Sequence, residues 1–315
     1  MSEIIEDIKN HPITRYEFGD YEIFSFVENR CHSDGGAMFG VIPKALWSRK
    51  ISADENNLIP MDNNCLLVKH DRHRILIDCG LGDALSDRER KVYGCETPTG
   101  IDKCLDRIGL SPDMITLVIP SHLHLDHVGG AFMQDGDKIV PRFPKARHAV
   151  SKIEWETAMN PDSRSAVAYP TDRLQILENA GVVDKHEGDI EIAPGVWIVR
   201  TGGHTAGHNA IIITDGEHSV FFAADLIPTS VHLRPEYISA ADLFPLETLE
   251  HKKKFYERID GEHWVLAFDH DIEYKFARVR QDGRNYHIEK VGEPFLAAVS
   301  SCRDNLKIKA EKDVD

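Results

Sequence analysis

Three histidines and an aspartate lie within the seven residues Ser121–His127, directly after an apolar run. Imidazole and carboxylate together suit zinc and its first-row neighbours rather than calcium or magnesium. In an extended segment side chains alternate with period two, so His122, His124 and Asp126 would face the same way. His127 breaks that alternation and must swing round as the chain turns through the glycines that follow. One short segment can therefore supply ligands to two neighbouring metal ions, which is typical of a di-metal hydrolase.

The composition is that of an ordinary globular chain with an acidic excess. Of its 315 residues, 42% are hydrophobic and 28% are charged, as in soluble proteins generally. The formal net charge is −15, which argues against non-specific binding to nucleic acid or to an anionic membrane surface. We therefore expect no nucleic-acid partner and no membrane partner.

The cysteines are scattered and include no C-x-x-C pair, so we expect reduced, mostly structural thiols. They are Cys31, Cys65, Cys79, Cys95, Cys104 and Cys302. Residues 1–9 are polar and lack the apolar core of a signal peptide. No window approaches the ~20 apolar residues of a membrane span. These features make the cytoplasm the expected location.

Short strand-like runs alternate with helical patterns along most of the chain. The pair Cys65–Lys69 and Arg74–Cys79 predicts a hairpin with its turn at Asp71–His73. Further strands are expected at Tyr21–Val27, Arg147–Ser151, Val196–Thr201, Asn209–Thr214, Ser219–Ala224 and Trp264–Asp269. Helices are expected at Ile101–Leu110, Lys152–Met159, Thr171–Ala180, Leu246–Ile259 and Pro294–Ser301. This order favours a layered α/β sandwich with helices on the outer faces of two sheets.

We expect residues 1–315 to form a single domain. Residues 1–60 would be an N-terminal extension, made of one strand and the loop-rich stretch 34–43, that covers the site.

Three later segments bring a possible metal ligand to the end of an apolar strand. The glycines of Gly202–His208 let the backbone turn tightly and bring the imidazole of His204 to a metal. Asp225 ends another such strand, and a carboxylate there must be paired, hydrogen-bonded or metal-bound. We expect it to bridge two metals. His270 ends a third strand and is the expected last ligand of the second metal.

Several polar neighbours are interpreted as supports rather than ligands. His208 is expected in the core or behind the ligands, and Asp78 as a buried hydrogen-bonding support beneath the metals. Asp269 and Asp271 flank the last histidine and could orient imidazole rings through hydrogen bonds. His263 would lie at the far end of its strand in a structural role.

Taken together, these pieces resemble the metallo-β-lactamase superfamily, whose H-x-H-x-D-H motif is His122–His127 here. The resemblance runs from about residue 60 to 270, through Asp78, the Gly-His-Thr-x-Gly-His element at His204, Asp225 and His270. It implies a four-layer αβ/βα sandwich with the metal site at the edge between the two sheets. It also implies two zinc ions, although other first-row divalent metals are possible. One zinc would be held by His122, His124 and His204, the other by Asp126, His127 and His270, with Asp225 bridging them.

Details of the motif narrow the branch. His124 stands where the oxygen-reducing diiron branch has a glutamate, which argues against that branch. Asp225 stands where the commonest zinc β-lactamases have a cysteine, which argues against antibiotic hydrolysis as the native activity. The stretch Asp34–Lys44, with Trp47, looks like the branch of quorum-quenching N-acyl-homoserine lactonases and organophosphate hydrolases. One departure concerns the tyrosine that these lactonases carry three residues after the bridging aspartate, beside the substrate carbonyl. Here that residue is Pro228.

We therefore predict a di-zinc hydrolase that opens lactone rings, above all those of N-acyl-homoserine lactones. A hydroxide bridging the metals would be the nucleophile. Asp126 would take its proton and return it to the leaving oxygen. Met38, Phe39 and Trp47 would contact the acyl chain, and Tyr237 is a candidate for the missing tyrosine. Alternatively, the three N-terminal residues pack over the edge of the sandwich or form the contact of a homodimer.

The same residues are compatible with other functions. The first alternative is an organophosphate or phosphodiester hydrolase that uses the same nucleophile on phosphorus. The second is a glyoxalase-like thioesterase or a persulfide dioxygenase, which share much of the metal motif. The last is a non-catalytic, metal-stabilised binding protein.

Overall fold

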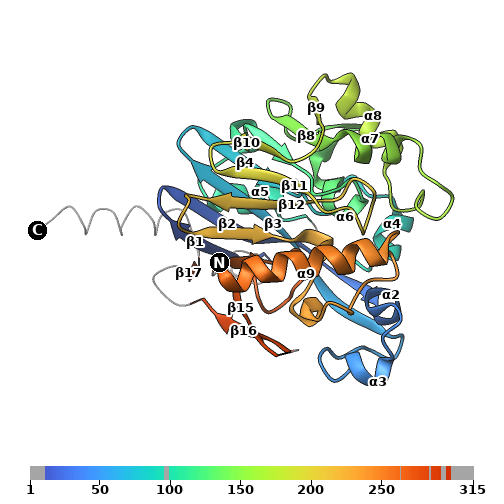
Figure 1. The fold of residues 1–315 in the computed structure, drawn as a ribbon. Helices are drawn as coiled ribbons and strands as arrows, with labels where there is room; N and C mark the ends of the chain where they lie inside the picture. Colours follow the sequence, from blue (N-terminus) through green and yellow to red (C-terminus); the bar gives the residue numbers. More distant parts are fainter. Residues whose placement is uncertain (1–10, 96–98, 263, 284, 292–295, 299–315) are drawn as a thin grey trace, which may run out of the picture.

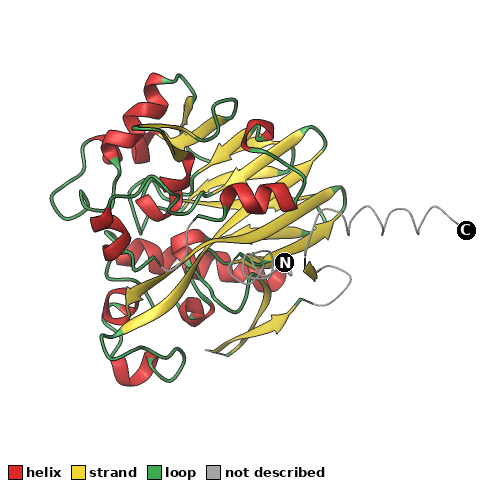
Figure 2. Cartoon of the chain, turned by 180° about the vertical axis from the view of Figure 1, so that it is seen from behind, coloured by secondary structure: helices red, strands yellow, loops and turns green. Residues whose placement is uncertain are grey.

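Two β-sheets lie face to face at the centre of the molecule, and helices lie on their outer faces (Figures 1 and 2). The computed structural model describes residues 11–95, 99–262, 264–283, 285–291 and 296–298. A separate two-stranded sheet consists of β6 (Phe132–Asp135) and β7 (Lys138–Pro141). The expected α/β sandwich is therefore confirmed.

The first sheet has eight strands in the order β17-β1-β2-β3-β4-β5-β8-β9. They are β17 (Leu296–Ala298), β1 (Ile13–Phe18), β2 (Tyr21–Asp34), β3 (Leu58–His70), β4 (His73–Ile77), β5 (Leu117–Ile119), β8 (Arg147–Ser151) and β9 (Val183–His186). Strands β1 to β4 are antiparallel neighbours, whereas β4, β5, β8 and β9 run parallel. The parallel part places the carboxyl ends of β4 and β5 side by side.

The second sheet has seven strands in the order β10-β11-β12-β13-β14-β15-β16. They are β10 (Ile190–Ala193), β11 (Val196–Arg200), β12 (Asn209–Thr214), β13 (Ser219–Phe222), β14 (Val265–Ala267), β15 (Phe276–Asp282) and β16 (Asn285–Lys290). Its one parallel pair is β13 with β14, among antiparallel neighbours. The carboxyl ends of these two strands therefore also meet.

The helices complete two outer layers. They are α2 (Gly35–Phe39), α3 (Lys44–Trp47), α4 (Asp87–Val92), α5 (Ile101–Arg107), α6 (Leu125–Val128), α7 (Lys152–Met159), α8 (Thr171–Asn179) and α9 (Pro245–Gly261). Short 3-10 turns are η1 (Pro112–Met114), η2 (Gly129–Ala131), η3 (Ala224–Leu226) and η4 (Ser230–Leu233). Helix α9 crosses the second sheet on its outer side (Figure 1).

Three apolar layers hold the sandwich together, as expected when alternate strand residues point to opposite faces. Between the sheets, residues such as Leu66 and Ile77 pack with Ile211 and Phe222 of the other sheet. Outside the first sheet, its other face packs against α5, α7 and α8. Outside the second sheet, Phe221 and its neighbours pack against α9. The layers are therefore helix, sheet, sheet and helix.

One loop-rich stretch also contains a short helix, and one expected helix near the C-terminus is wrong. The stretch 34–43 is not only loop, because α2 begins there. The side chain of Asp34 accepts a hydrogen bond from the backbone N–H of Ala37 and caps that helix. The described part of the expected helix Pro294–Ser301 is strand β17, which pairs with β1 at the sheet edge. The free backbone groups of an edge strand explain that pairing.

The histidine motif does not continue β5 as an extended segment. The strand ends at Ile119, and α6 begins at Leu125, so the expected alternation through Asp126 is wrong. His122 and His124 lie on the connection, whereas Asp126 and His127 lie on the helix. Adjacent helical residues point about 100° apart, and this lets Asp126 and His127 serve different positions.

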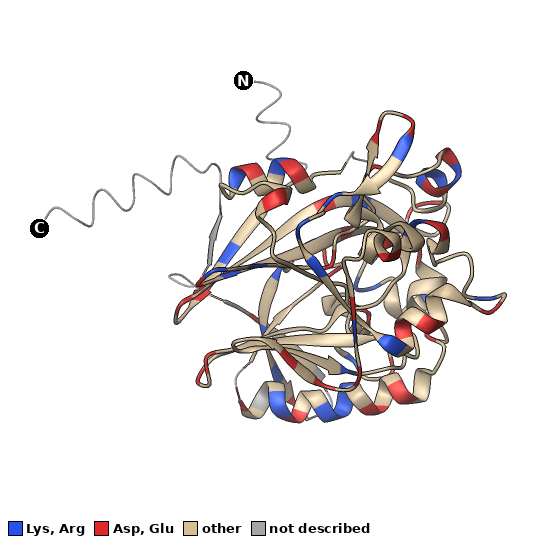
Figure 3. Ribbon diagram, turned by 90° about the horizontal axis from the view of Figure 1, so that it is seen from above, with Lys and Arg blue, Asp and Glu red and all other residues tan. Residues whose placement is uncertain are grey.

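Within the described residues, no helix is long and apolar enough to cross a membrane. Acidic and basic residues alternate along the ribbon, and blue and red segments lie next to each other on the same helices (Figure 3).

Candidate metal centre

The strand ends of both sheets deliver their polar residues to one edge of the sandwich. The first sheet supplies Asp78 after β4 and the histidine motif after β5. The second supplies His204 after β11, Asp225 after β13 and His270 after β14. Gly203, at φ +80, lets the second sheet's loop turn: a Cβ there would lie 2.4 Å from Thr248 Oγ1.

Four of these side chains form a first group whose ligand atoms all lie within 4.8 Å of one another: His122, His124, His204 and Asp225. His124 Nδ1 lies 3.0 Å from His122 Nε2 and 3.1 Å from His204 Nε2. Asp225 Oδ2 lies 2.9 Å from His204 Nε2. Three imidazoles and one carboxylate thus converge on one point.

A second group shares Asp225 and adds His127, Asp269 and His270. Asp225 Oδ1 lies 3.3 Å from His270 Nε2 and 3.7 Å from His127 Nε2. Asp269 Oδ2 lies 3.5 Å from His270 Nε2. The two carboxylate oxygens of Asp225 therefore face different groups, which is the geometry of a bridging ligand.

Two aspartates, Asp126 and Asp269, lie at the second group in different positions. Asp126 belongs to neither four-residue group, and its Oδ2 lies 3.9 Å from Nε2 of both His127 and His270. Asp269, expected only to orient a ring, lies inside the second group. The side chain of Asp126 is 24% exposed and that of Asp269 is 2% exposed. Asp126 therefore closes the second group on the solvent side.

The outer nitrogens of four imidazoles are held in place. His127 Nδ1 donates to Asp78 Oδ2 at 2.8 Å, and His204 Nδ1 donates to Asp242 Oδ1 at 2.9 Å. His270 Nδ1 donates to the Asp62 carbonyl at 3.1 Å, and Ser121 Oγ lies 3.1 Å from His122 Nδ1. Metal-binding histidines typically have such a partner on the second nitrogen. With the outer nitrogen protonated, each inner Nε2 presents a lone pair.

The chemistry of these residues fits a pair of divalent metal ions. Within the described residues, His127 Nε2, Asp225 Oδ1 and both oxygens of Asp269 are buried without a hydrogen-bond partner. Leaving such groups unpaired is costly, and buried charges are normally paired or coordinate a metal. A mixed imidazole and carboxylate set is the one that zinc and its neighbours bind.

The carboxylates of the centre also have perturbed acidities. Burial alone would raise the pKa of Asp225. When no metal is bound, His204 and His127 are protonated on both nitrogens, and their charge holds the pKa of Asp225 well below its usual range. Burial raises the pKa of Asp269 well above its usual range, against the opposing charge of His270, and the carboxylate of Asp225 raises it further. A cation beside Asp269 would therefore favour its ionised form.

A buried glutamate supports the first group from behind, and no local pattern in the sequence predicts it. Glu154 of α7 accepts hydrogen bonds from the backbone N–H of Leu123 at 3.0 Å and from Thr205 Oγ1 at 2.6 Å. It also accepts from the Tyr169 hydroxyl at 3.1 Å, and the Tyr169 ring lies 4.8 Å from the ring of His124. One side chain therefore joins the two loops that carry the imidazoles.

Other histidines and aspartates of the sequence lie around the centre. His208 is buried outside both groups, with Nδ1 2.6 Å from Thr201 Oγ1. Asp271 accepts from the backbone N–H groups of Ser230, Glu273 and Tyr274, so it shapes the chain beyond His270. His263 lies outside the described residues.

The proposed substrate contacts form an apolar cluster beside the centre. Phe39 and Trp47 are buried with ring centroids 5.1 Å apart, and Phe39 meets Tyr237 edge-on at 6.0 Å. Leu125, the neighbour of Asp126, packs in the same cluster, and Met38 lies against it half-buried. The packing expected for Phe39 and Trp47 is therefore seen, and Met38 keeps exposed surface.

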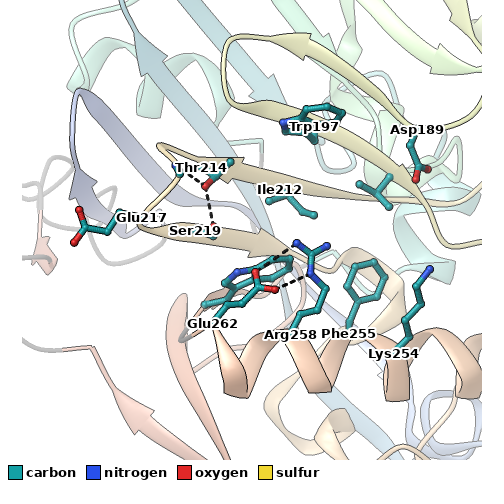
Figure 4. Close-up of a pocket in the computed structure, with 13 residues that line it drawn as sticks. Asp189, Trp197, Ile212, Thr214, Glu217, Ser219, Lys254, Phe255, Arg258 and Glu262 are labelled. Carbon is teal, nitrogen blue, oxygen red and sulfur yellow. Dashed lines mark hydrogen bonds and ion pairs between the residues drawn. The ribbon is translucent and has the colours of Figure 1, made fainter.

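A cavity of about 710 Å³ lies elsewhere, between α9 and the outer face of the second sheet. Figure 4 shows Arg258 there, paired with Glu262, and Trp197 on the opposite wall. None of the candidate metal ligands lines it.

Comparison with known proteins places this geometry in a family. The model of the metallo-beta-lactamase superfamily matches residues 58–270, more than half of the chain. An N-acyl homoserine lactonase from Bacillus thuringiensis is 27% identical over 220 residues, which cover 66% of this chain and 81% of that protein.

Solved structures agree on the fold. A probable metal-dependent hydrolase from Staphylococcus aureus has a TM-score of 0.80 at 28% identity, covering 88% of this chain and 99% of that one. AidC, a dizinc quorum-quenching lactonase in complex with a product, has a TM-score of 0.75 at 20% identity, covering 90% and 98%. With the superfamily's His and Asp residues gathered at the edge of its sandwich, this chain belongs to the metallo-β-lactamase superfamily and is a hydrolase of that fold.

Proposed function

We propose that this protein opens the ring of N-acyl-homoserine lactones at a centre of two zinc ions. The observation that carries the proposal is the pair of ligand groups that share Asp225. The Bacillus thuringiensis relative is an N-acyl homoserine lactonase and AidC is a dizinc lactonase, and both support this choice of substrate and metal.

Zinc bound by the two groups would supply a Lewis acid for the lactone carbonyl and an acidified water as the nucleophile. His122, His124, His204 and Asp225 would hold one ion, and His127, Asp269, His270 and Asp225 the other. The fixed outer nitrogens keep each imidazole in the tautomer that binds through its inner nitrogen.

Asp126 is the residue placed to move the proton. Its carboxylate closes the second group and is partly open to solvent, with Oδ2 3.9 Å from both His127 and His270. It would take the proton from the attacking water and return it to the leaving oxygen of the opened ring. General acid–base catalysis of this kind contributes typically 10²–10⁴-fold in rate.

The carbonyl of the substrate has no tyrosine at the expected position. Pro228 has no hydroxyl, and its own carbonyl accepts a hydrogen bond from the backbone N–H of His270 at 3.1 Å. Its place in this chain is therefore to fix the strand end that carries His270. Met38, half-buried against the apolar cluster, and Tyr237, a buried member of it, are the proposed contacts of the acyl chain.

Lactone turnover by metal-loaded protein tests the proposal. Purified protein would be stripped with a chelator, reloaded with zinc, and its metal content measured. Ring opening would then be followed on homoserine lactones with acyl chains of four to twelve carbons, beside a phosphotriester and a thioester. We expect two zinc ions per chain and the highest kcat/KM on the lactones. A fully loaded protein without lactone turnover, or one faster on the phosphotriester, would refute the proposed substrate.

A further inference from the structure

Helix α9 sends one lysine into the interior of the protein. Lys252 is fully buried, and its ammonium donates to the carbonyl oxygens of His232 at 2.7 Å, Arg234 at 3.0 Å and Tyr237 at 2.8 Å. Lysine has three N–H donors, and all three are used on one loop. A buried ammonium is tolerated only when it is hydrogen-bonded in this way.

The loop that Lys252 holds contacts α2 (Gly35–Phe39), which carries the proposed substrate contacts Met38 and Phe39 and is called the wall below. The ring of His232 stacks on Phe39, with centroids 4.7 Å apart and planes at 7°. His232 Nε2 donates to the Met38 carbonyl at 2.8 Å, while Nδ1 faces Thr229 Oγ1 at 2.7 Å. Burial lowers the pKa of His232 to about 4, so the ring is neutral and keeps this single donor.

A second contact ties the same two segments together. The backbone N–H of Ala240 donates to the Ala37 carbonyl at 2.8 Å, and Ser239 Oγ donates to that carbonyl at 3.2 Å. Helix α2 therefore contacts the loop through two successive carbonyls, those of Ala37 and Met38, although about 200 residues separate the two segments in the sequence.

Helix α9 also braces the metal side of this loop, one turn earlier. Thr248 Oγ1 donates to Asp242 Oδ2 at 2.6 Å, and Asp242 Oδ1 accepts from His204. Residues four apart lie on the same face of a helix. One face of α9 thus fixes the imidazole of His204 through Thr248 and the apolar wall through Lys252.

We infer that Lys252 is a positioning residue for substrate selectivity. It fixes the His232–Tyr237 loop through three carbonyls, and through His232 it fixes Met38 and Phe39 of α2, which are among the proposed contacts of the acyl chain. This inference rests on the proposed lactonase function for its substrate, but the ordering of the wall stands without it. Lys252 touches neither the ligands nor the reacting atoms, so its removal is expected to change KM more than kcat.

The test compares Lys252→Met with Lys253→Met, a matched control at the neighbouring, exposed lysine. Methionine keeps an unbranched side chain, one heavy atom shorter than that of lysine, and removes the three donors. In Lys252→Met we expect KM for long-chain lactones to rise about ten- to a hundred-fold, with kcat for the shortest lactone nearly unchanged and zinc content intact. In Lys253→Met neither value should move. Lys252→Arg should restore part of the long-chain KM, because it retains a cationic donor.

Hydrogen exchange on the metal-free protein supplies a readout without substrate. Lys252→Met should lose protection at 229–242 and at 35–47, and retain it in the core strands. His232→Phe keeps the stack on Phe39 and removes the donor to Met38, so it decides the matter if Lys252→Met does not fold. It should show the same pattern of lost protection in α2.

Three results would overturn the inference. One is unchanged protection and an unchanged chain-length profile in both variants. Another is a uniform fall in kcat with loss of zinc, which would make Lys252 a support of the metal centre. The third is lost protection throughout the core, which would make it a support of the fold alone. Absence of lactone turnover in the unmutated protein would instead refute the proposed function, and hydrogen exchange would still test the wall.

Discussion

The first ligand group has three imidazoles and one carboxylate, whereas the second has two imidazoles and two carboxylates, with Asp126 at its border. The groups also differ in origin. The first group takes two of its four residues, His122 and His124, from the motif after β5, whereas the second group takes only His127 from that motif. Imidazole-rich sites suit zinc, and carboxylates also accept harder cations such as manganese. The acidic half is therefore the one suited to handle a proton and to exchange its metal.

Asp225 is the only residue common to both halves, so its removal should have the largest effect. In Asp225→Asn we expect the loss of several kcal/mol of transition-state stabilisation, which corresponds to about a 10³-fold or greater fall in lactone turnover. Metal content should fall below two ions per chain. Elemental analysis and steady-state kinetics measure both. If Asp225→Asn kept two tightly held ions and normal turnover, the two groups would not function as one centre.

The comparison is sharpened by the two aspartates of the acidic half. Asp126→Asn should lower kcat by about 10²–10³-fold while zinc content at saturation stays at two, because the buried ligands remain. Asp269→Asn should instead lose the second ion, because it removes a buried member of the group. Metal titration and kcat measured on the same samples separate these roles. Loss of the second ion in Asp126→Asn, with Asp269→Asn unaffected, would reverse the assignment.

Each ligand group can also be weakened separately, by changing the carboxylate that accepts a hydrogen bond from Nδ1 of one of its histidines. Asp242→Asn weakens the hold on His204 in the first half, and Asp78→Asn that on His127 in the second. Each should lower metal affinity about 10–100-fold in its own half. The release of metal ions to a competing chelator measures this. The ion of the first group should be released more easily in Asp242→Asn, and the ion of the second group more easily in Asp78→Asn. Asp113→Asn, at an exposed ion pair, is the control. Equal weakening of both steps in both variants would mean that the halves are not separable.

The sequence predicts those residues of the centre that belong to a recognisable pattern within a short stretch of the chain. The motif at His122–His127 is contiguous, and His204, Asp225 and His270 each follow an apolar strand, so residue type and strand pattern were enough to select them. The layered fold was predicted for the same reason. The extended alternation expected from His122 to Asp126 was wrong, because α6 begins at Leu125. The ligand role of Asp126 came from the family resemblance and stays a prediction.

The supports could not be predicted, because they act over long distances in sequence. Glu154, Asp242 and Lys252 lie on helices or loops with no local pattern that distinguishes them from exposed neighbours. Their partners in the loops they hold are 15 to 51 residues away along the chain. Only the packing of α7 and α9 against the sheets brings them to the loops they hold. Similarly, β17 replaced an expected helix because the edge of β1 offered it hydrogen bonds.

His148 is a buried histidine that belongs to neither ligand group, and no carboxylate raises its pKa as carboxylates do for His127 and His204. Burial lowers the pKa of His148, in β8, to about 4 from its usual 6.5. The unfolded chain therefore takes up a proton as the pH falls through 6.5, while the folded chain stays neutral until about 4. The free energy of unfolding therefore falls as the pH drops from 6.5 towards 4. The fall due to His148 is about 2 kcal/mol between pH 7 and pH 5. Urea unfolding of the unmutated protein and of His148→Leu, at equal zinc and both pH values, measures it. His148→Leu should lose about 2 kcal/mol less over this interval, and equal losses would mean that His148 is protonated in the folded state as readily as in the unfolded one.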